Sequence, residues 1–217
     1  RRAGRAGDRT ACRHPGPRRR LSRPLDRAFF ERPVGEVAPD LIGCTLLVDG
    51  CGGTIVETER YQQDDEASHS FAGETARTRP MFGPGGFAYV YLSYGIHKLF
   101  NVTADRAGHG AAVLIRALEP TIGLEEMRSR RPGRSDRELC SGPGRLAEAL
   151  GISLSQSGRD LLEPPFTLLS RPEEWREEIL TGPRIGISKA VDQPWRFCLS
   201  GSRFTSLPRL VPRPAES

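Results

Sequence analysis

The stretch from residue 55 to residue 70 reads Ile-Val-Glu-Thr-Glu-Arg-Tyr-Gln-Gln-Asp-Asp-Glu-Ala-Ser-His-Ser, an apolar start followed by a row of reactive side chains. The β-branched residues at its start predict a strand. Because alternate residues of a strand share a face, Glu57, Glu59 and Tyr61 are expected to point the same way. The acidic residues that follow predict a loop, and this loop is expected to bring His69 close to Glu59 and Tyr61. A carboxylate, a phenol ring and an imidazole are thus predicted to line one pocket, although an edge strand with solvated acids would have the same pattern.

The composition limits the class of protein. The 217 residues suffice for one domain with a sizeable core. The net charge of +5 suits a polyanionic partner, but nearly all of the positive charge is arginine, whose use also follows genome composition. The five cysteines are scattered without metal-ligand spacing, which argues against a zinc site or a disulfide framework and favours a reducing cytoplasm. No apolar run is long enough to cross a membrane, and nothing resembles a secretory signal.

The chain is predicted to hold one domain between two tails. Residues 1–23 are rich in Arg, Gly and Pro, so they bury too little apolar surface to fold and are expected to form a disordered basic tail. Residues 24–207 carry the periodicity of a domain, and residues 208–217 are expected to be loose. Within the domain the patterns predict helices at residues 34–42, 120–130 and 141–150, and strands at residues 44–48, 55–61, 87–93, 111–118, 184–188 and 196–200.

Three further features favour contact with a phosphate or a base. Arg77 and Arg79 precede a Gly-rich loop, where a phosphate contact and a solvated turn are both consistent with the residues. Residues 141–145, Ser-Gly-Pro-Gly-Arg, begin a helix, which predicts either an anion site or a plain helix cap. Tyr94 is followed by Gly95 at the end of a strand, and an aromatic side chain exposed at a turn indicates a binding surface.

Taken together, these motifs resemble the alkyladenine (3-methyladenine) DNA glycosylase family of vertebrates and many bacteria, over residues 29–206. The resemblance rests on ordered segments: Ile55-Val-Glu-Thr-Glu-Arg-Tyr61, His69-Ser70, Met81-Phe82, Tyr89-Val-Tyr91, Tyr94-Gly95, Asn101, Leu114-Ile-Arg-Ala-Leu-Glu-Pro120, Asp136-Arg-Glu-Leu-Cys-Ser-Gly-Pro143 and Arg184-Ile-Gly-Ile187. It implies an α+β fold, a single mixed domain around a curved, mostly antiparallel β-sheet with flanking helices. It also implies a monomeric protein of the bacterial cytoplasm and nucleoid that works without a metal or other cofactor.

The activity that the resemblance implies is the repair of double-stranded DNA containing damaged purines. An alkylated or deaminated purine (3-methyladenine, 7-methylguanine, hypoxanthine or ethenoadenine) is flipped out of the stack, and hydrolysis of its N-glycosidic bond leaves an abasic site for base excision repair. Aromatic rings hold the base, and a carboxylate deprotonates the attacking water. Cutting the strand as well would need an amine, and lysine occurs only at Lys98 and Lys189, so the enzyme is expected to be monofunctional.

The resemblance assigns two catalytic residues. The water-activating glutamate of the family matches Glu59, and the arginine that holds the water and a nearby phosphate matches Arg116. Glu57 shares the strand face of Glu59 but is given no catalytic role.

The base is expected to meet five residues. Tyr61 and His69 match the pair that sandwiches it, and Tyr91 completes the aromatic box. Asn101 matches the residue that crowds the exocyclic amine of guanine, and the backbone carbonyl of Ile185 matches a contact to the attacking water. Outside the pocket, Tyr94 matches the wedge that enters the DNA stack, with Ile96 beside it. Phosphate contacts are expected from Arg77, Arg79, Ser141, Gly142 and Arg145.

Two alternatives use the same residues differently. A non-catalytic damaged-DNA-binding protein would explain the basic charge and Tyr94, but not a glutamate beside Tyr61. A metallohydrolase would use Glu57, Glu59 and His69 as metal ligands, yet no further histidine or cysteine has a useful spacing.

Overall fold

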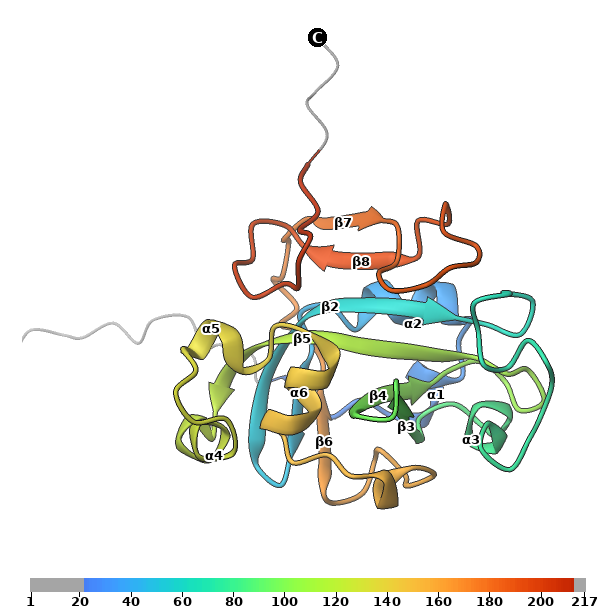
Figure 1. The fold of residues 1–217 in the computed structure, drawn as a ribbon, viewed down its shortest axis with the longest axis horizontal. Helices are drawn as coiled ribbons and strands as arrows, with labels where there is room; N and C mark the ends of the chain where they lie inside the picture. The colour runs from blue at the N-terminus through green and yellow to red at the C-terminus, as the bar shows by residue number, and fades with distance from the viewer. Residues whose placement is uncertain (1–21, 213–217) are drawn as a thin grey trace, which may run out of the picture.

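The longest strands set the fold of residues 22–212, the part of the chain that the computed structural model describes. β2 (Cys51–Tyr61) and β5 (Ala112–Ile122) run antiparallel, side by side in the middle of the molecule (Figure 1). On its other edge, β2 pairs first with β1 (Thr45–Val48) and then with β8 (Arg196–Leu199). The β2–β5 pairing shifts register on both sides of Glu57, and such bulges bend a strand. The bend lets β2 leave one neighbour and join another.

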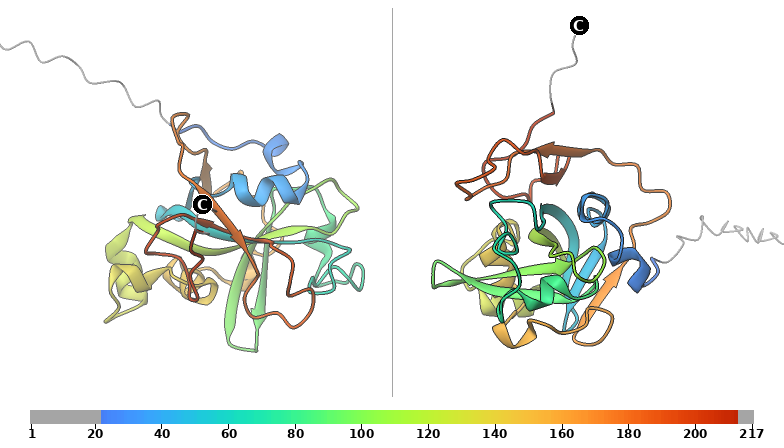
Figure 2. Two further views of the ribbon diagram at one scale, coloured as in Figure 1. Left: turned by 90° about the horizontal axis from the view of Figure 1, so that it is seen from above. Right: turned by 90° about the vertical axis from the view of Figure 1, so that its right-hand side faces the viewer.

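The remaining strands complete one curled antiparallel sheet. β3 (Ala88–Ser93) and β4 (His97–Thr103) form a hairpin, and β4 pairs with β5. β6 (Phe166–Leu169) pairs with β1, and β7 (Ile179–Gly182) pairs with β8. The order along the sheet is β3-β4-β5-β2-β1-β6, with β7 and β8 joined to it at β2. Both views in Figure 2 show the β3–β4 hairpin, in green, projecting from the body of the molecule.

Short helices pack on this sheet. They are α1 (Arg27–Phe30), α2 (Val34–Asp40), α3 (Arg79–Phe82), α4 (Leu124–Arg130), α5 (Asp136–Leu139), α6 (Pro143–Ala149) and the 3₁₀ turn η1 (Leu154–Gln156). α2 packs against β2, whereas α6 packs against β4 and β5. α6 begins beside the projecting hairpin, because Gly144 faces the side chain of His97 at the start of β4.

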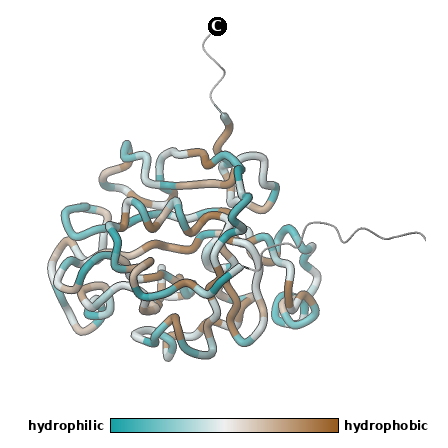
Figure 3. Tube along the Cα trace, turned by 180° about the vertical axis from the view of Figure 1, so that it is seen from behind, coloured by the Kyte–Doolittle hydropathy of each residue, from teal (hydrophilic) through white to brown (hydrophobic). Residues whose placement is uncertain are grey.

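The core follows the central strands, where Figure 3 shows the hydrophobic segments of the chain, while the peripheral loops are hydrophilic. Ile55, Phe100, Ile115 and Leu118 are completely buried there. Burial of such side chains drives folding, at roughly 25 cal/mol for each Å² of apolar surface removed from water. Glu57, which lies on β2 like Ile55, is also completely buried but is charged, and it is described with the site below.

The α+β fold with a curved antiparallel sheet, expected from the resemblance, is confirmed, but two predicted elements are wrong. Residues 120–121 do not begin a helix: Pro120 still pairs with Gly53 in the sheet, and α4 starts only after Gly123, whose φ is 72°. Residues 184–188 do not form a strand but an irregular segment after β7. Pro183 cannot donate to a ladder, and Gly186 has a φ of 78°, outside the β region.

Most of both predicted tails lies outside the described residues. Arg23, the last residue of the first predicted tail, is already paired with the domain, since its N–H donates to Ser170 Oγ at 3.2 Å. Among residues 22–212, no helix is both long and apolar enough to cross a membrane.

Candidate active site

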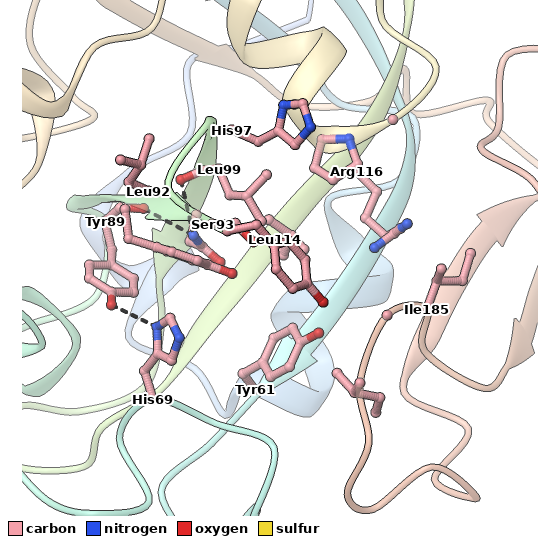
Figure 4. A pocket seen from close by; sticks show the side chains of 18 of the residues that line it. Tyr61, His69, Tyr89, Leu92, Ser93, His97, Leu99, Leu114, Arg116 and Ile185 are labelled. Atoms are coloured by element: carbon pink, nitrogen blue, oxygen red, sulfur yellow. Dashed lines mark hydrogen bonds between the residues drawn. The ribbon is translucent and has the colours of Figure 1, made fainter.

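A cavity of about 580 Å³ lies between the β3–β4 hairpin, the end of β2, the start of α6 and the segment after β7. Its volume is in the range of sites for small molecules. Figure 4 shows side chains from these separate elements converging on it. The lining includes all five residues predicted to meet a base, namely Tyr61, His69, Tyr91, Asn101 and Ile185, together with Arg116, Tyr94 and Arg145.

Glu59 lies one layer behind this lining. Its side chain is completely buried where β2 runs between β5 and β8, so the prediction that it lines the pocket beside Tyr61 is wrong in this detail. Its Oε2 accepts a hydrogen bond from the Tyr61 hydroxyl at 2.8 Å, and its Oε1 accepts one from the Ile185 N–H at 2.8 Å. Arg116 Nη1 is 3.2 Å from Oε1. Three of the groups that line the cavity therefore hold the carboxylate directly.

The charges around Glu59 are balanced. Arg116 also donates from Nε to Glu57 Oε1 at 3.0 Å, and Arg196 donates from Nε to the same oxygen at 2.7 Å. Burial alone would raise the pKa of Glu57, but the charges of Arg116 and Arg196 lower it below its ordinary value. Glu57 thus stays ionised as a partner of arginines, as expected for a residue without a catalytic role of its own.

The phenol of Tyr61 is the donor in its bond to Glu59. Burial, followed by the nearby charge of Glu59, raises the pKa of Tyr61 well above 10. The guanidinium of Arg184 lies over the ring of Tyr61, 4.6 Å from the ring centroid. The same guanidinium forms a fully buried ion pair with Asp65. Arg184 precedes Ile185, so one ion pair supports both Tyr61 and the backbone that binds Glu59.

Aromatic rings form the opposite wall (Figure 4). The ring of His69 meets that of Tyr91 edge to face at 4.4 Å, and Tyr91 stacks on Tyr89 at 5.5 Å. His69 Nδ1 is hydrogen bonded to the Tyr89 hydroxyl at 2.9 Å. Burial, and then the charge of Arg77, lowers the pKa of His69, which favours a neutral imidazole at neutral pH. A neutral ring in an aromatic wall suits stacking on a flat base.

Asn101 reaches the cavity from β4 and is held in place. Its side-chain amide donates to the backbone carbonyl of Tyr89 at 3.0 Å, and only 4% of the residue is exposed. A fixed side chain can exclude a bulky substituent of the base that enters, which is the role that the resemblance implies.

The predicted wedge lies at the tip of the β3–β4 hairpin. Tyr94 is 85% exposed and Ile96 is 71% exposed. The Ile96 N–H donates to Ser93 O at 3.1 Å, so Tyr94 and Gly95 are the central residues of a tight turn. Both have positive φ, 49° and 73°, and a tyrosine in this conformation is strained by about 1–2 kcal/mol. Strain of this kind at an exposed aromatic residue points to a function for the tip.

The residues predicted to bind phosphate are divided between two places. Gly142 and Arg145 line the cavity at the start of α6, and Arg145 Nη1 donates to Ser141 Oγ at 3.3 Å. Arg77, on the loop that leads into α3, and Arg79, the first residue of α3, are exposed outside the cavity lining. Arg79 Nε is 3.4 Å from Glu74 Oε1. The structure thus brings the start of α6 to the site. Arg77 and Arg79 lie outside the lining, but Arg77 is close enough for its charge to act on His69.

Sequence reasoning missed two sets of site residues. Tyr89 shares a strand face with Tyr91, and this spacing of two residues could have identified it. Asp65 and Arg184, by contrast, are 119 residues apart, and no local pattern predicts their ion pair. The ligands of the metallohydrolase alternative do not come together either: within the described ranges, no group of three His, Cys, Asp or Glu side chains could hold a metal ion.

A carboxylate held by an arginine behind an aromatic cavity, beside a strained aromatic tip, is the combination expected of an enzyme that removes bases from DNA. A sequence model of methylpurine-DNA glycosylase matches residues 28–203. A protein of Rhodopseudomonas palustris named "Putative 3-methyladenine DNA glycosylase" is 59% identical over 188 residues, covering 87% of this chain and 92% of its own. Proteins with the same name from Nitrosospira multiformis (58% over 179 residues, 82% and 92% covered) and Bradyrhizobium diazoefficiens (55% over 189 residues, 87% and 94% covered) are also similar.

The chain belongs to the methylpurine-DNA glycosylase family. It is accordingly a DNA glycosylase, a hydrolase of N-glycosidic bonds that acts in DNA repair. The non-catalytic alternative is therefore set aside.

Proposed function

We propose that this enzyme flips alkylated or deaminated purines, such as 3-methyladenine, 7-methylguanine, hypoxanthine and ethenoadenine, out of double-stranded DNA and hydrolyses their N-glycosidic bond. It acts as a monomer, without a cofactor, and leaves an intact abasic site. The observation that carries the proposal is the placement of Glu59, which is in contact with Tyr61, Arg116 and Ile185 at the wall of the aromatic cavity.

The chemical step needs a base for one proton. Water attacks the anomeric carbon of the sugar, the bond to the purine breaks with its electron pair moving to the base, and Glu59 takes a proton from the water. The three contacts to Glu59 occupy three of about four lone-pair positions on a carboxylate. The position that remains, on Oε2 beside the Tyr61 hydroxyl, is where the attacking water would bind once the site opens to admit it.

Arg116 supports both reactants. Burial alone would lower its pKa, but Glu59 and Glu57 raise it above the ordinary value, so it stays a cation throughout the reaction. Its side chain lines the cavity, where it can orient the water and contact a phosphate next to the flipped nucleotide. The flipped purine would lie between Tyr61 and His69, at a gain of roughly 1–3 kcal/mol for each stacking contact.

The steps outside the cavity divide between the hairpin tip and α6. Tyr94 would fill the gap that the flipped nucleotide leaves, because its ring is exposed at the tip of a projecting hairpin. Arg145 and the backbone N–H groups at the start of α6 would bind a phosphate near the mouth of the cavity.

The test is release of hypoxanthine from a duplex with a single hypoxanthine·thymine pair, with enzyme in excess and a chelator present. Base release that resists chelation, with product DNA that stays full length until it is heated in alkali, supports the proposal. Binding without release, or release that chelation abolishes, contradicts it.

A further inference from the structure

Behind the cavity wall lies a cluster of four charged side chains, Glu57, Glu59, Arg116 and Arg196, here called the acid–arginine cluster. None of the four residues is more than 6% exposed. Two carboxylates meet two guanidinium groups, so the cluster carries no net charge. Buried ions are costly unless they are paired and hydrogen bonded, and removing one partner leaves an uncompensated charge. Each member of the cluster therefore affects the protonation of the carboxylates.

Glu57 is the common anchor of this cluster. Its Oε1 accepts from Arg116 Nε and Arg196 Nε, and also from Ser206 Oγ at 2.7 Å. Its Oε2 accepts from the Ser206 N–H at 2.6 Å. Arg196 also donates to the carbonyl of Pro208 at 2.8 Å, so the C-terminal segment of the domain is attached to the same cluster.

The three nitrogens of the Arg116 guanidinium have three different partners. Nε donates to Glu57 at 3.0 Å, Nη2 donates to Ser206 Oγ at 3.4 Å, and Nη1 is 3.2 Å from Glu59 Oε1. Because a guanidinium is planar, contacts at Nε and Nη2 fix the direction of Nη1. Glu57 and Ser206 thus determine how Arg116 approaches Glu59.

We propose that Glu57 is a positioning residue that sets the charge balance at Glu59: it orients Arg116 and draws part of the positive charge of both arginines away from Glu59. Glu59 then remains able to accept a proton from water. This inference rests on the proposed role of Glu59 as general base. Without Glu57, two arginines would act on Glu59 alone, and its carboxylate would be protonated only at lower pH. Without Arg196, two carboxylates would share one arginine, and protonation would begin at higher pH.

Several groups face Glu59 from the elements packed around it. They are Arg116 on β5, Arg196 and Cys198 on β8, Glu57 and Tyr61 on β2, Tyr91 on β3 and the backbone N–H of Ile185. Burial raises the pKa values of Tyr91 and Cys198 to about 12, and that of Tyr61 lies well above 10. None of these three groups ionises in an assay from about pH 5 to about pH 9.

The experiment measures the single-turnover rate of hypoxanthine release against pH for the full chain and for Glu57→Gln, Arg196→Met and Arg196→Lys. The midpoint of the acid limb is expected to move by about one pH unit downward in Glu57→Gln and by about one unit upward in Arg196→Met. Arg196→Lys, which keeps the charge, is expected to keep the wild-type midpoint. Glu148→Gln is the matched control, because Glu148 forms an arginine ion pair, with Arg131 at 2.9 Å, outside the cluster.

Opposite displacements in Glu57→Gln and Arg196→Met support the inference, since a merely structural role would lower the rate without moving the midpoint. If Glu57→Gln does not fold, the contrast between Arg196→Met and Arg196→Lys decides. Unchanged midpoints in the folded variants overturn the inference, and so does loss of the cooperative melting transition in all three, which would assign the cluster to stability alone. Glu59→Gln distinguishes failure of the proposed function from failure of this inference. If Glu59→Gln stays active, the proposed function is wrong. If Glu59→Gln is inactive and the midpoints of the other variants do not move, only the inference about Glu57 is wrong.

Discussion

The wall behind the cavity and the tip of the β3–β4 hairpin are built in opposite ways. Glu57 is completely buried and accepts four hydrogen bonds, whereas Tyr94 is 85% exposed on a two-residue turn. The first region is polar and charged inside the core, and the second is aromatic on the surface. Both depart from the usual distribution of residues, and each departure has a cost in free energy that folding alone does not require.

The difference indicates a division of labour. A buried, charge-balanced site can control proton transfer because water does not screen its charges. An exposed ring can insert between base pairs because nothing has to move out of its way. Substitutions in the two regions should therefore affect different steps, one the cleavage of the glycosidic bond and the other the extrusion of the nucleotide.

The largest effect is expected in the interior. Glu59→Gln removes the proposed proton acceptor but keeps a similar shape, so the single-turnover rate of hypoxanthine release should fall by at least about 10³-fold. Binding to damaged duplex, measured by fluorescence anisotropy, should keep its wild-type affinity. Glu163→Gln, on an exposed loop, serves as the control. A near wild-type rate in Glu59→Gln would refute the assignment of the general base.

At the tip the effect should be smaller and should depend on the substrate. Tyr94→Ala removes one stacking contact, and the rate on a paired lesion should fall about 10- to 100-fold, in line with about 1–3 kcal/mol. The loss should shrink for a lesion in single-stranded DNA, which costs less to extrude. Leu154→Ala, at another exposed apolar residue, is the control. Equal losses on all substrates would show that the tip acts on the fold rather than on extrusion.

Asn101 lies on the β3–β4 hairpin and also lines the cavity, so its substitution tests which bases the cavity admits. Asn101→Ala opens space at the cavity wall, so excision of guanine from a guanine·thymine mismatch should rise by about tenfold or more. Release of hypoxanthine should change less. Asn101→Leu keeps the branched shape, takes up at least as much space and removes the amide, so it should continue to exclude guanine if the exclusion is steric. Guanine excision by the Leu variant equal to that of the Ala variant would rule out crowding as the cause.

The smallest effect concerns the two lysines. Lys98 lies on β4 just after the tip and Lys189 lies in the segment after β7, and neither lines the cavity. Lys98→Ala should leave the rate of base release unchanged, and borohydride should trap no covalent adduct with the wild-type protein. An adduct that disappears in Lys98→Ala or Lys189→Ala would mean that an amine, and not only water, attacks the sugar.

Much of the fold followed from local patterns, and the errors have physical causes. The hairpin strands β1 and β2 and the helix α6 were predicted, because their periodicity and their turn residues agree. Pro120 was misread as a helix start. A proline near the end of a strand, here paired with Gly53, cannot be told in the sequence from a proline at the first position of a helix. Arg184 was misread as part of a strand, because the apolar alternation of residues 184–188 outweighed Pro183 and Gly186, and its buried ion pair and ring contact involve residues distant in sequence.

The residues of the candidate site were predicted, but the burial of Glu59 behind the cavity lining was not. The resemblance supplied the residues that line the cavity, and the structure brings most of them together. The strand pattern placed Glu59 beside Tyr61, but it could not reveal that β8 covers the other edge of β2 and buries the carboxylate. Long-range pairings such as Glu57 with Arg196, 139 residues apart, are beyond any reading of local periodicity.

The positive φ of Tyr94 has a consequence for how the enzyme searches DNA. The turn fixes the backbone beneath the ring before any contact with DNA, so the proposed insertion would cost little backbone conformational entropy. A preorganised probe can test each base step that it passes without a preceding rearrangement. Weakly stacked steps would admit it quickly and sound ones would not, so recognition of damage would begin at the hairpin, before any base reaches the cavity.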